Sequence, residues 1–180
     1  MSPRVFDPAD GRSGNEARAP EFALDQHLFF WFTQVLDRRD RNLADALKSY
    51  GLRAPEWRVL ASLHARHRLS MSELADLTSI ERTTLSRTVD RMVRKGWVVR
   101  LSDTSDARVT RLAPAAGGER LFVRIWPAVH SLNEAAVAGI PDPLVATVRL
   151  VLEGMRRNLD ASLAARGRRP ALKSAAKASA

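Results

Sequence analysis

The chain of 180 residues contains no cysteine. This absence excludes disulfide bonds, thiolate metal ligands and any redox switch built on cysteine. No stretch approaches the roughly 20 consecutive apolar residues that a membrane-spanning helix needs, and residues 1–20 lack the apolar segment of a signal peptide. We therefore expect a cytoplasmic protein without a membrane partner.

The motifs of common enzymes are missing too. The sequence has no glycine-rich phosphate loop and no Gly-x-Ser-x-Gly turn, and no pair of carboxylates stands out from ordinary surface acids. His64 and His67 lie three residues apart near the end of a predicted helix, where they could share a metal ion. Two solvated side chains, favoured by the negative end of the helix, are the simpler interpretation. We expect no enzymatic activity, no catalytic residues, no cofactor and no metal site.

Positive charge is distributed unevenly along the chain. Lys and Arg number 29 against 20 Asp and Glu, which gives a formal net charge of +9 at pH 7. The excess is confined to residues 80–112 and 164–180, because acidic and basic side chains balance elsewhere. Localised positive charge is typical of a surface that binds a polyanion. Residues 164–180 predict a disordered basic tail, which either attracts phosphates nonspecifically or is simply a solubilising end.

A single tyrosine and few β-branched runs favour a mostly helical fold. Apolar residues recur at helical spacing from Phe22 to about Tyr50, on more than one face of the predicted helix. Such a helix needs cover from a second subunit or from the last helix of the chain. A second helix begins near Pro55, and a short third helix begins at Ser70, whose spacing from Glu73 fits a capping box.

The segment from Glu81 to Lys95 predicts a fourth helix with two different faces. Its apolar positions share one face and are Leu85, Val89, Met92 and Val93. The opposite face carries Thr83, Thr84, Arg87, Arg91 and Arg94. A short helix, a tight turn and a helix with a polar outer face form a helix-turn-helix. Arginine hydrogen-bonds guanine or phosphate and threonine contacts bases, so this face suits the DNA major groove; an ordinary solvated helix face is the alternative.

Two short strands after this helix predict a wing. They comprise Trp97–Leu101 and Val109–Leu112, joined by a turn over Ser102–Ala107. The ribbon would place three arginines near the DNA backbone, namely Arg100, Arg108 and Arg111. An arginine at its tip could enter a narrow minor groove. Alternatively, Asp106 and Arg108 pair only to hold the turn.

The C-terminal third predicts two more helices separated by a Gly- and Pro-containing break at residues 139–143. The last helix carries its apolar residues on one side: Leu144, Val148, Val151, Leu152, Met155, Leu159 and Leu163. With the N-terminal helix, this surface predicts a two-fold homodimer. A monomer with a fuller internal core is the alternative.

Three motifs resemble the multiple-antibiotic-resistance regulator (MarR) family. They are residues 72–75 (SELA), 84–98 (TLSRTVDRMVRKGWV) and 100–108 (RLSDTSDAR), within a resemblance that covers about residues 52–120. The resemblance implies a mainly α dimer with one winged helix in each subunit. By position it also implies DNA contacts from Thr83, Thr84, Ser86, Arg87 and Arg91, and a wing arginine at Arg108.

The chain departs from the family pattern in its wing. Asp106 reaches Leu112 two residues sooner than is usual, and Ala113 replaces a threonine, so we expect a shorter wing. Without cysteine the chain cannot act as a thiol-based peroxide sensor. The resemblance also implies a small aromatic or anionic effector. His27, Trp31 and Trp57 are candidate lining residues, although core packing explains the tryptophans as well.

The predicted fold is mainly α, with a winged helix-turn-helix and a two-stranded wing between flanking helices. The predicted regions are a flexible arm (1–21), a helical dimerisation region (22–51 and 114–163), a winged helix-turn-helix (52–113) and a disordered basic tail (164–180). The predicted function is that of a homodimeric, nucleoid-associated transcriptional repressor, which binds a pseudo-palindromic operator in double-stranded DNA and is released by an effector. The predicted DNA-binding residues are Thr83, Thr84, Ser86, Arg87, Arg91, Arg94, Arg100 and Arg108. A protein-interaction module and a nonspecific DNA-organising protein are the alternatives.

Overall fold

The computed structural model describes residues 23–103 and 109–167. It forms two compact units, one up to Arg38 and the other from Arg39 onward. The predicted N-terminal arm, the turn of the wing with Arg108, and residues 168–180 of the predicted tail lie outside the described residues.

The first unit contains the 3-10 turn η1 (Leu24–Gln26) and the beginning of α1 (Leu28–Lys48). The helix predicted from Phe22 is therefore present but begins later, because His27 has extended backbone angles and its N–H closes η1 on the carbonyl of Leu24. Within this unit the indole Nε1 of Trp31 donates a hydrogen bond to the Asp25 carbonyl at 2.7 Å.

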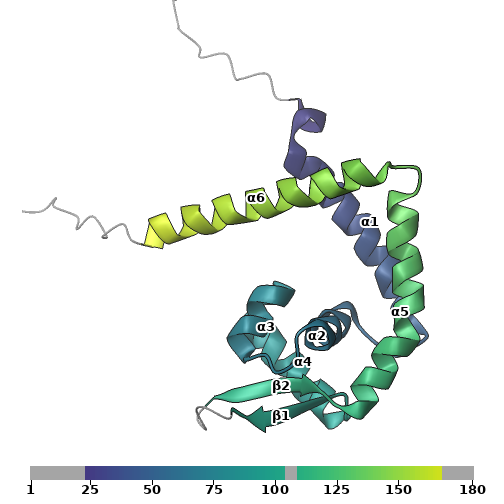
Figure 1. Ribbon diagram of the computed structural model, residues 1–180, viewed down its shortest axis with the longest axis vertical. Coiled ribbons are helices and arrows are strands. Elements are labelled where there is room, and N and C mark those ends of the chain that lie inside the picture. Colours follow the sequence, from purple (N-terminus) through teal and green to yellow (C-terminus); the bar gives the residue numbers. More distant parts are fainter. Residues whose placement is uncertain (1–22, 104–108, 168–180) are drawn as a thin grey trace, which may run out of the picture. The chain divides into compact units, whose positions relative to one another are not determined.

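The second unit holds the remaining elements (Figure 1). In chain order they are α2 (Ala54–Ala65), α3 (Met71–Thr78), α4 (Arg82–Arg94), β1 (Val98–Ser102), β2 (Thr110–Pro114), α5 (Ala116–Val137) and α6 (Asp142–Gly167). Pro55 occupies the first turn of α2, and the capping box at the start of α3 is formed by Ser70 and Glu73, as predicted. The tail is predicted to start at Ala164, whereas α6 continues to Gly167. Ala164, Ala165 and Arg166 have good helix propensity, which favours this extension.

The predicted wing is present as a two-stranded antiparallel ribbon (Figure 1). Val98 pairs with Pro114 at one end and Ser102 with Thr110 at the other. Leu69, before α3, adds an isolated bridge to Leu112 of β2. This bridge ties the ribbon to the segment that leads into the helix-turn-helix.

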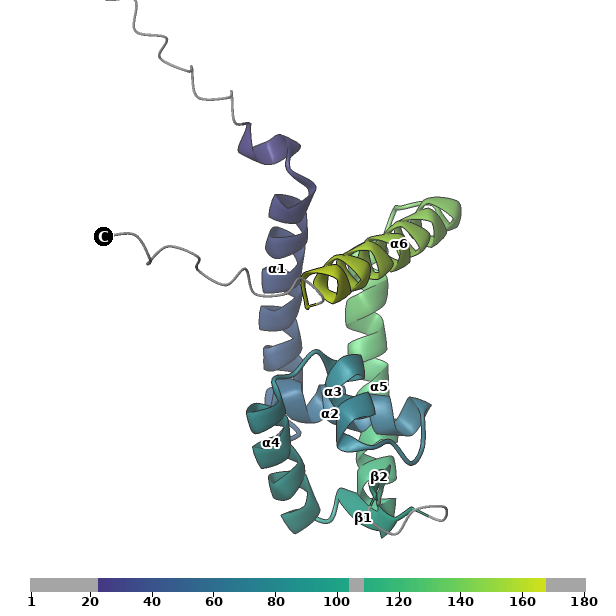
Figure 2. The same ribbon diagram turned by 90° about the vertical axis from the view of Figure 1, so that its left-hand side faces the viewer.

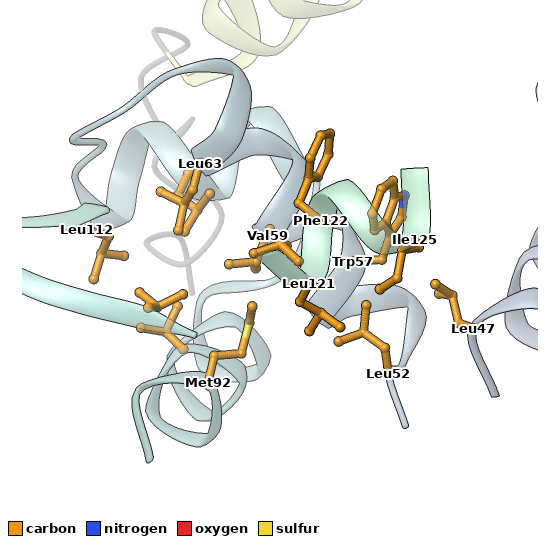
Figure 3. Packing of buried hydrophobic residues seen from close by; sticks show 14 of the residues in the cluster. Leu47, Leu52, Trp57, Val59, Leu63, Met92, Leu112, Leu121, Phe122 and Ile125 are labelled. Atoms are coloured by element: carbon orange, nitrogen blue, oxygen red, sulfur yellow. The ribbon is translucent and has the colours of Figure 1, made fainter. Parts of the chain in front are cut away.

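One apolar core joins α2, α4, α5 and β2 (Figure 3). Val59 of α2, Met92 of α4 and Leu112 of β2 are all fully buried in it. The rings of Trp57 and Phe122 stack 5.4 Å apart and nearly parallel, which fixes α2 against α5. Burial of this many large side chains is the main stabilising term for a domain of this size.

The apolar side predicted to be buried on α6 is exposed in the single chain. Leu144, Val148 and Leu159 are each more than half exposed. In the part of the chain that is described, no single helix is both long and apolar enough to cross a membrane. Only α5 and α6 taken together, bent by 101° at their junction, pass that test of length and composition.

The start of α5 lies directly against the backbone that follows α4. The N–H of Ala115 donates to the carbonyl of Trp97 at 3.0 Å. A Cβ atom added at Gly118 would lie 2.1 Å from the same carbonyl oxygen, which no side chain tolerates. Gly118 is therefore required for the close packing of α5 on Trp97, in the segment between α4 and β1.

We predict that Gly118→Ala destabilises the protein by at least about 2 kcal/mol, because the methyl group must displace backbone atoms. Gly154→Ala is the matched control in α6, where only the mobile end of Arg157 lies within 4 Å. Ala has the better helix propensity, so the control should be stabilised by about 0.5–1 kcal/mol. Urea unfolding of both variants measures these changes. Equal effects of the two substitutions would contradict the account.

Candidate nucleic-acid interface

The N-terminus of α4 is fixed by the carboxylate of Glu81. Its two oxygens accept hydrogen bonds from the backbone N–H groups of Thr83 and Thr84 at 2.9 and 3.1 Å. These bonds lower the pKa of the Glu81 carboxyl below its ordinary value. Ser79, in the preceding turn, adopts the left-handed conformation with φ 53°, which ends α3 and reverses the chain.

Helix α4 lies next to α2 and α3 (Figure 2), and its buried and exposed residues divide into the two predicted faces. Leu85, Val89 and Met92 are fully buried, and Val93 is half-buried. The exposed side chains include five of the predicted DNA-binding residues: Thr83, Thr84, Ser86, Arg87 and Arg94. In the described part of the chain, Arg87 and Arg94 form no salt bridge within 4.0 Å. The helix therefore presents hydroxyl and guanidinium groups outward.

Arg91, also predicted to contact DNA, has a protein partner instead. Its Nε donates to Oε1 of Glu56 at 2.7 Å, and Nζ of Lys95 donates to the same oxygen at 3.3 Å. The Glu56 side chain is completely buried, while that of Arg91 is 28% exposed. Glu56 thus links α2 to two successive turns of α4.

The environment of Glu56 keeps its carboxyl ionised. Burial alone would raise its pKa, but the hydrogen bonds from the Arg53 N–H and Arg91, together with the charge of Lys95, outweigh burial and lower the pKa. Glu56 is not among the site residues predicted from the sequence. The helical spacing of Glu56, Val59 and Leu60 places them on one face of α2, and this pattern indicates that the Glu56 side chain faces the core.

Arg100 and Arg111 of the predicted wing lie in the part of the chain that the structure describes, whereas Arg108 lies outside it. Arg100 is exposed and pairs with Asp90 of α4 at 2.5 Å. Arg111 bridges Glu73 of α3, at 2.7 Å, and Asp103, at 2.5 Å. Arg111 therefore connects the wing to the first helix of the helix-turn-helix. The reach of Arg108 into a minor groove, and its pairing with Asp106, remain predictions.

The three candidate effector residues belong to different units. His27 and Trp31 lie in the first unit, and Trp57 lies in the second. Trp57 is 4% exposed and stacked on Phe122, which is core packing. A neighbouring hollow of about 540 Å³, which we call the α2–α5 hollow, is lined by Ala61, His64, Ala65, Phe122, Val123 and Trp126.

His64 of α2 has a protein partner on α5. Its Nδ1 lies 2.7 Å from Oε2 of Glu119, and its ring stacks on Phe122. Among the described residues there is no group of three or more His, Asp or Glu side chains placed to hold a metal.

Comparison with known proteins places this geometry in a family. Residues 50–109 match the sequence model of the MarR family. The transcriptional repressor IacR of Pseudomonas putida is 27% identical over 150 residues, which cover 83% of this chain and 90% of IacR. Residues 50–109, which include the helix-turn-helix, form a MarR-type region, and the chain as a whole is similar to MarR-family regulators.

Solved MarR-family structures share the fold. A MarR variant from Escherichia coli in complex with operator DNA is 26% identical, with a TM-score of 0.63 over 71% of this chain and 92% of that one. CouR from Rhodococcus jostii RHA1, bound to p-coumaroyl-CoA, is 25% identical, with a TM-score of 0.70 over 75% of this chain and 95% of CouR. The predicted mainly α winged-helix fold is confirmed, and the chain is similar to MarR-family transcriptional regulators.

We predict that Glu56→Gln destabilises the protein by about 1–3 kcal/mol at pH 7, because a charge-assisted bond to α4 is lost. The folded-state pKa of Glu56 is lowered, so its contribution is full above the unfolded pKa of about 4.3 and is lost as pH falls through the folded pKa. The difference from wild type should therefore shrink at about pH 3. Urea unfolding at both pH values, with exposed Glu153→Gln as control, measures it. A difference that is equal at the two pH values would refute the charge assignment.

Proposed function

We propose that this protein is a homodimeric transcriptional repressor that inserts α4 of each subunit into successive major grooves of a pseudo-palindromic operator. The observation that carries this proposal is the outward face of α4, where Thr83, Thr84, Ser86, Arg87 and Arg94 are exposed opposite a fully buried apolar face. The guanidinium groups of arginine and the hydroxyl groups of threonine can form hydrogen bonds with base edges and phosphates. The operator complex of the related E. coli MarR variant supports this use of the fold.

Within this proposal the two arginines of α4 have different roles. Arg87 is exposed, so we assign it a direct contact with DNA. Arg91 is engaged by Glu56, so we assign it the positioning of α4, with a contact to DNA only through its outer nitrogens. Arg100 and Arg108 are proposed to contact phosphates on either side of the major groove. The short wing limits how far Arg108 reaches.

Arg87→Ala is predicted to weaken binding to the selected operator by about 1–3 kcal/mol, or roughly 5- to 150-fold. If the contact is to a phosphate, the slope of log K against log salt falls by about one unit as well. Arg149→Ala, at an exposed arginine of α6, is the matched control and should change neither quantity. Fluorescence anisotropy at several salt concentrations measures both. Wild-type affinity of Arg87→Ala would favour the alternative of a protein-interaction module.

We propose that the dimer is formed by the predicted dimerisation region, residues 22–51 and 114–163. The support is the row of exposed apolar side chains along one side of α6, from Leu144 to Leu163. Exposed apolar rows of this length mark interaction surfaces. A second copy is the proposed occupant, because a two-fold axis closes such a surface on itself and brings two copies of α4 to one DNA duplex.

Leu152→Arg should yield monomers, because it places a charge within the apolar row of α6. Leu150→Arg is the matched control, since Leu150 lies on the opposite side of the same helix by its spacing and is 67% exposed. Size-exclusion chromatography with light scattering measures the mass of each variant. A Leu152→Arg protein that stays dimeric would exclude α6 from the interface.

We further propose that a small aromatic or anionic effector releases the protein from DNA. The related CouR, whose structure contains p-coumaroyl-CoA, supports an effector in this family. An effector acts on DNA affinity only if it binds one arrangement of the two α4 helices better than the other.

A further inference from the structure

The hydroxyl group of Thr83, in the first turn of α4, is hydrogen-bonded to the side chain of Glu81. Its Oγ1 lies 3.0 Å from Oε1 of Glu81. The bonds from the Thr83 and Thr84 backbone N–H groups, and the one from this hydroxyl, lower the pKa of the Glu81 carboxyl, so it is ionised at pH 7. An ionised carboxylate only accepts hydrogen bonds, and the Thr83 hydroxyl is therefore the donor in this pair.

This bond limits what the Thr83 hydroxyl can offer to a further partner. A hydroxyl group has one hydrogen and two lone pairs, and Thr83 has given its hydrogen to Glu81. Donating that hydrogen to a neutral acceptor instead would replace a charge-assisted bond with a weaker one. Thr83 is exposed, so towards a partner on the outer face of α4 its hydroxyl is an acceptor.

The two other exposed hydroxyl groups on this face of α4 are not restricted in this way. They belong to Thr84 and Ser86, and in the part of the chain that the structure describes neither hydroxyl oxygen forms a hydrogen bond. Each can rotate to donate or to accept. Of the three hydroxyl groups, only that of Thr83 has a fixed role.

The bases of DNA differ in the group that they present to such an acceptor in the major groove. Adenine and cytosine present an amino group, which donates, whereas guanine and thymine present a carbonyl oxygen, which accepts. A side chain that only accepts therefore bonds to adenine or cytosine and is left unpaired against guanine O6 or thymine O4. Thr83 is the second residue of α4, and in helix-turn-helix proteins the N-terminal residues of the recognition helix contact base edges.

We propose that Thr83 is a specificity-determining residue that selects adenine or cytosine over guanine or thymine on the DNA strand that it faces. Glu81 is a positioning residue in this scheme, because it acts by holding the hydrogen of the Thr83 hydroxyl and needs no contact with DNA. The inference rests on the proposed function, since it requires α4 to enter a major groove. It adds the class of base that is read at one position of each half-site.

Selection of bound sites from random duplex DNA, run in parallel with the full-length wild-type protein and with Thr83→Val, tests the proposal. Valine keeps the branched shape and a methyl group and removes only the hydroxyl. The two selected motifs should differ at one base pair of each half-site. There the wild type should enrich adenine or cytosine on one strand, and Thr83→Val should show no preference. Thr84→Val should retain the preference at that base pair.

Fluorescence anisotropy then compares the selected operator with one that carries guanine for adenine, or thymine for cytosine, at that base pair in both half-sites. Wild type should bind the altered operator about tenfold more weakly, because one hydrogen bond is lost in each half-site. Thr83→Val should bind both operators with nearly equal affinity. Glu81→Gln should show a smaller penalty than wild type, because its amide can donate to the Thr83 hydroxyl and so release the hydrogen of that hydroxyl. Thermal melting checks that each variant is folded.

Three results would overturn the proposal. The first is enrichment of guanine or thymine by the wild type at the base pair where Thr83→Val loses its preference. The second is an unchanged motif in folded Thr83→Val. The third is a full wild-type penalty in folded Glu81→Gln, which would show that the carboxylate does not set the direction of the bond. All three presuppose that the wild type enriches a motif, whereas enrichment of no motif would contradict the proposed function itself, so the two failures are distinguishable.

Discussion

The fully buried carboxylate of Glu56 is the interaction on which the placement of α4 depends. A buried charge is stable only when its hydrogen-bonding capacity is filled, and Glu56 is satisfied from its own helix by the Arg53 N–H and from α4 by Arg91 and Lys95. The adjacent residue, Trp57, stacks on α5. Two neighbouring residues of α2 therefore fix α4 on one side and the long helix α5 on the other.

Local chemistry made much of this fold predictable. The capping box of Ser70 and Glu73 and the proline at the start of α2 each act within one turn of helix. The two-faced pattern of residues 81–95 lies within a single helix. The sequence alone therefore specifies all three features. Their positions agree with the structure to within a residue or two. The wing was predictable for the same reason, since its β-branched runs flank a turn rich in Asp and Ser.

Contacts between distant segments were not predictable in this way. The pairing of Glu56 with Arg91 spans 35 residues, and although helical spacing places Glu56 on the buried face of α2, it does not identify the partner on α4. The need for Gly118 arises from the carbonyl of Trp97, which only the folded chain brings near. The start of α1 at Leu28 and the continuation of α6 to Gly167 show that helix ends are set by local backbone geometry that apolar periodicity does not encode.

The central claim is that two copies of α4 read one DNA duplex through their exposed threonines and arginines. Selection of bound sites from a pool of random duplex DNA tests it most directly. The account predicts an enriched two-fold symmetric motif whose half-sites are centred about one helical turn, or about 34 Å, apart. Enrichment of no motif would contradict it, and so would a motif without two-fold symmetry.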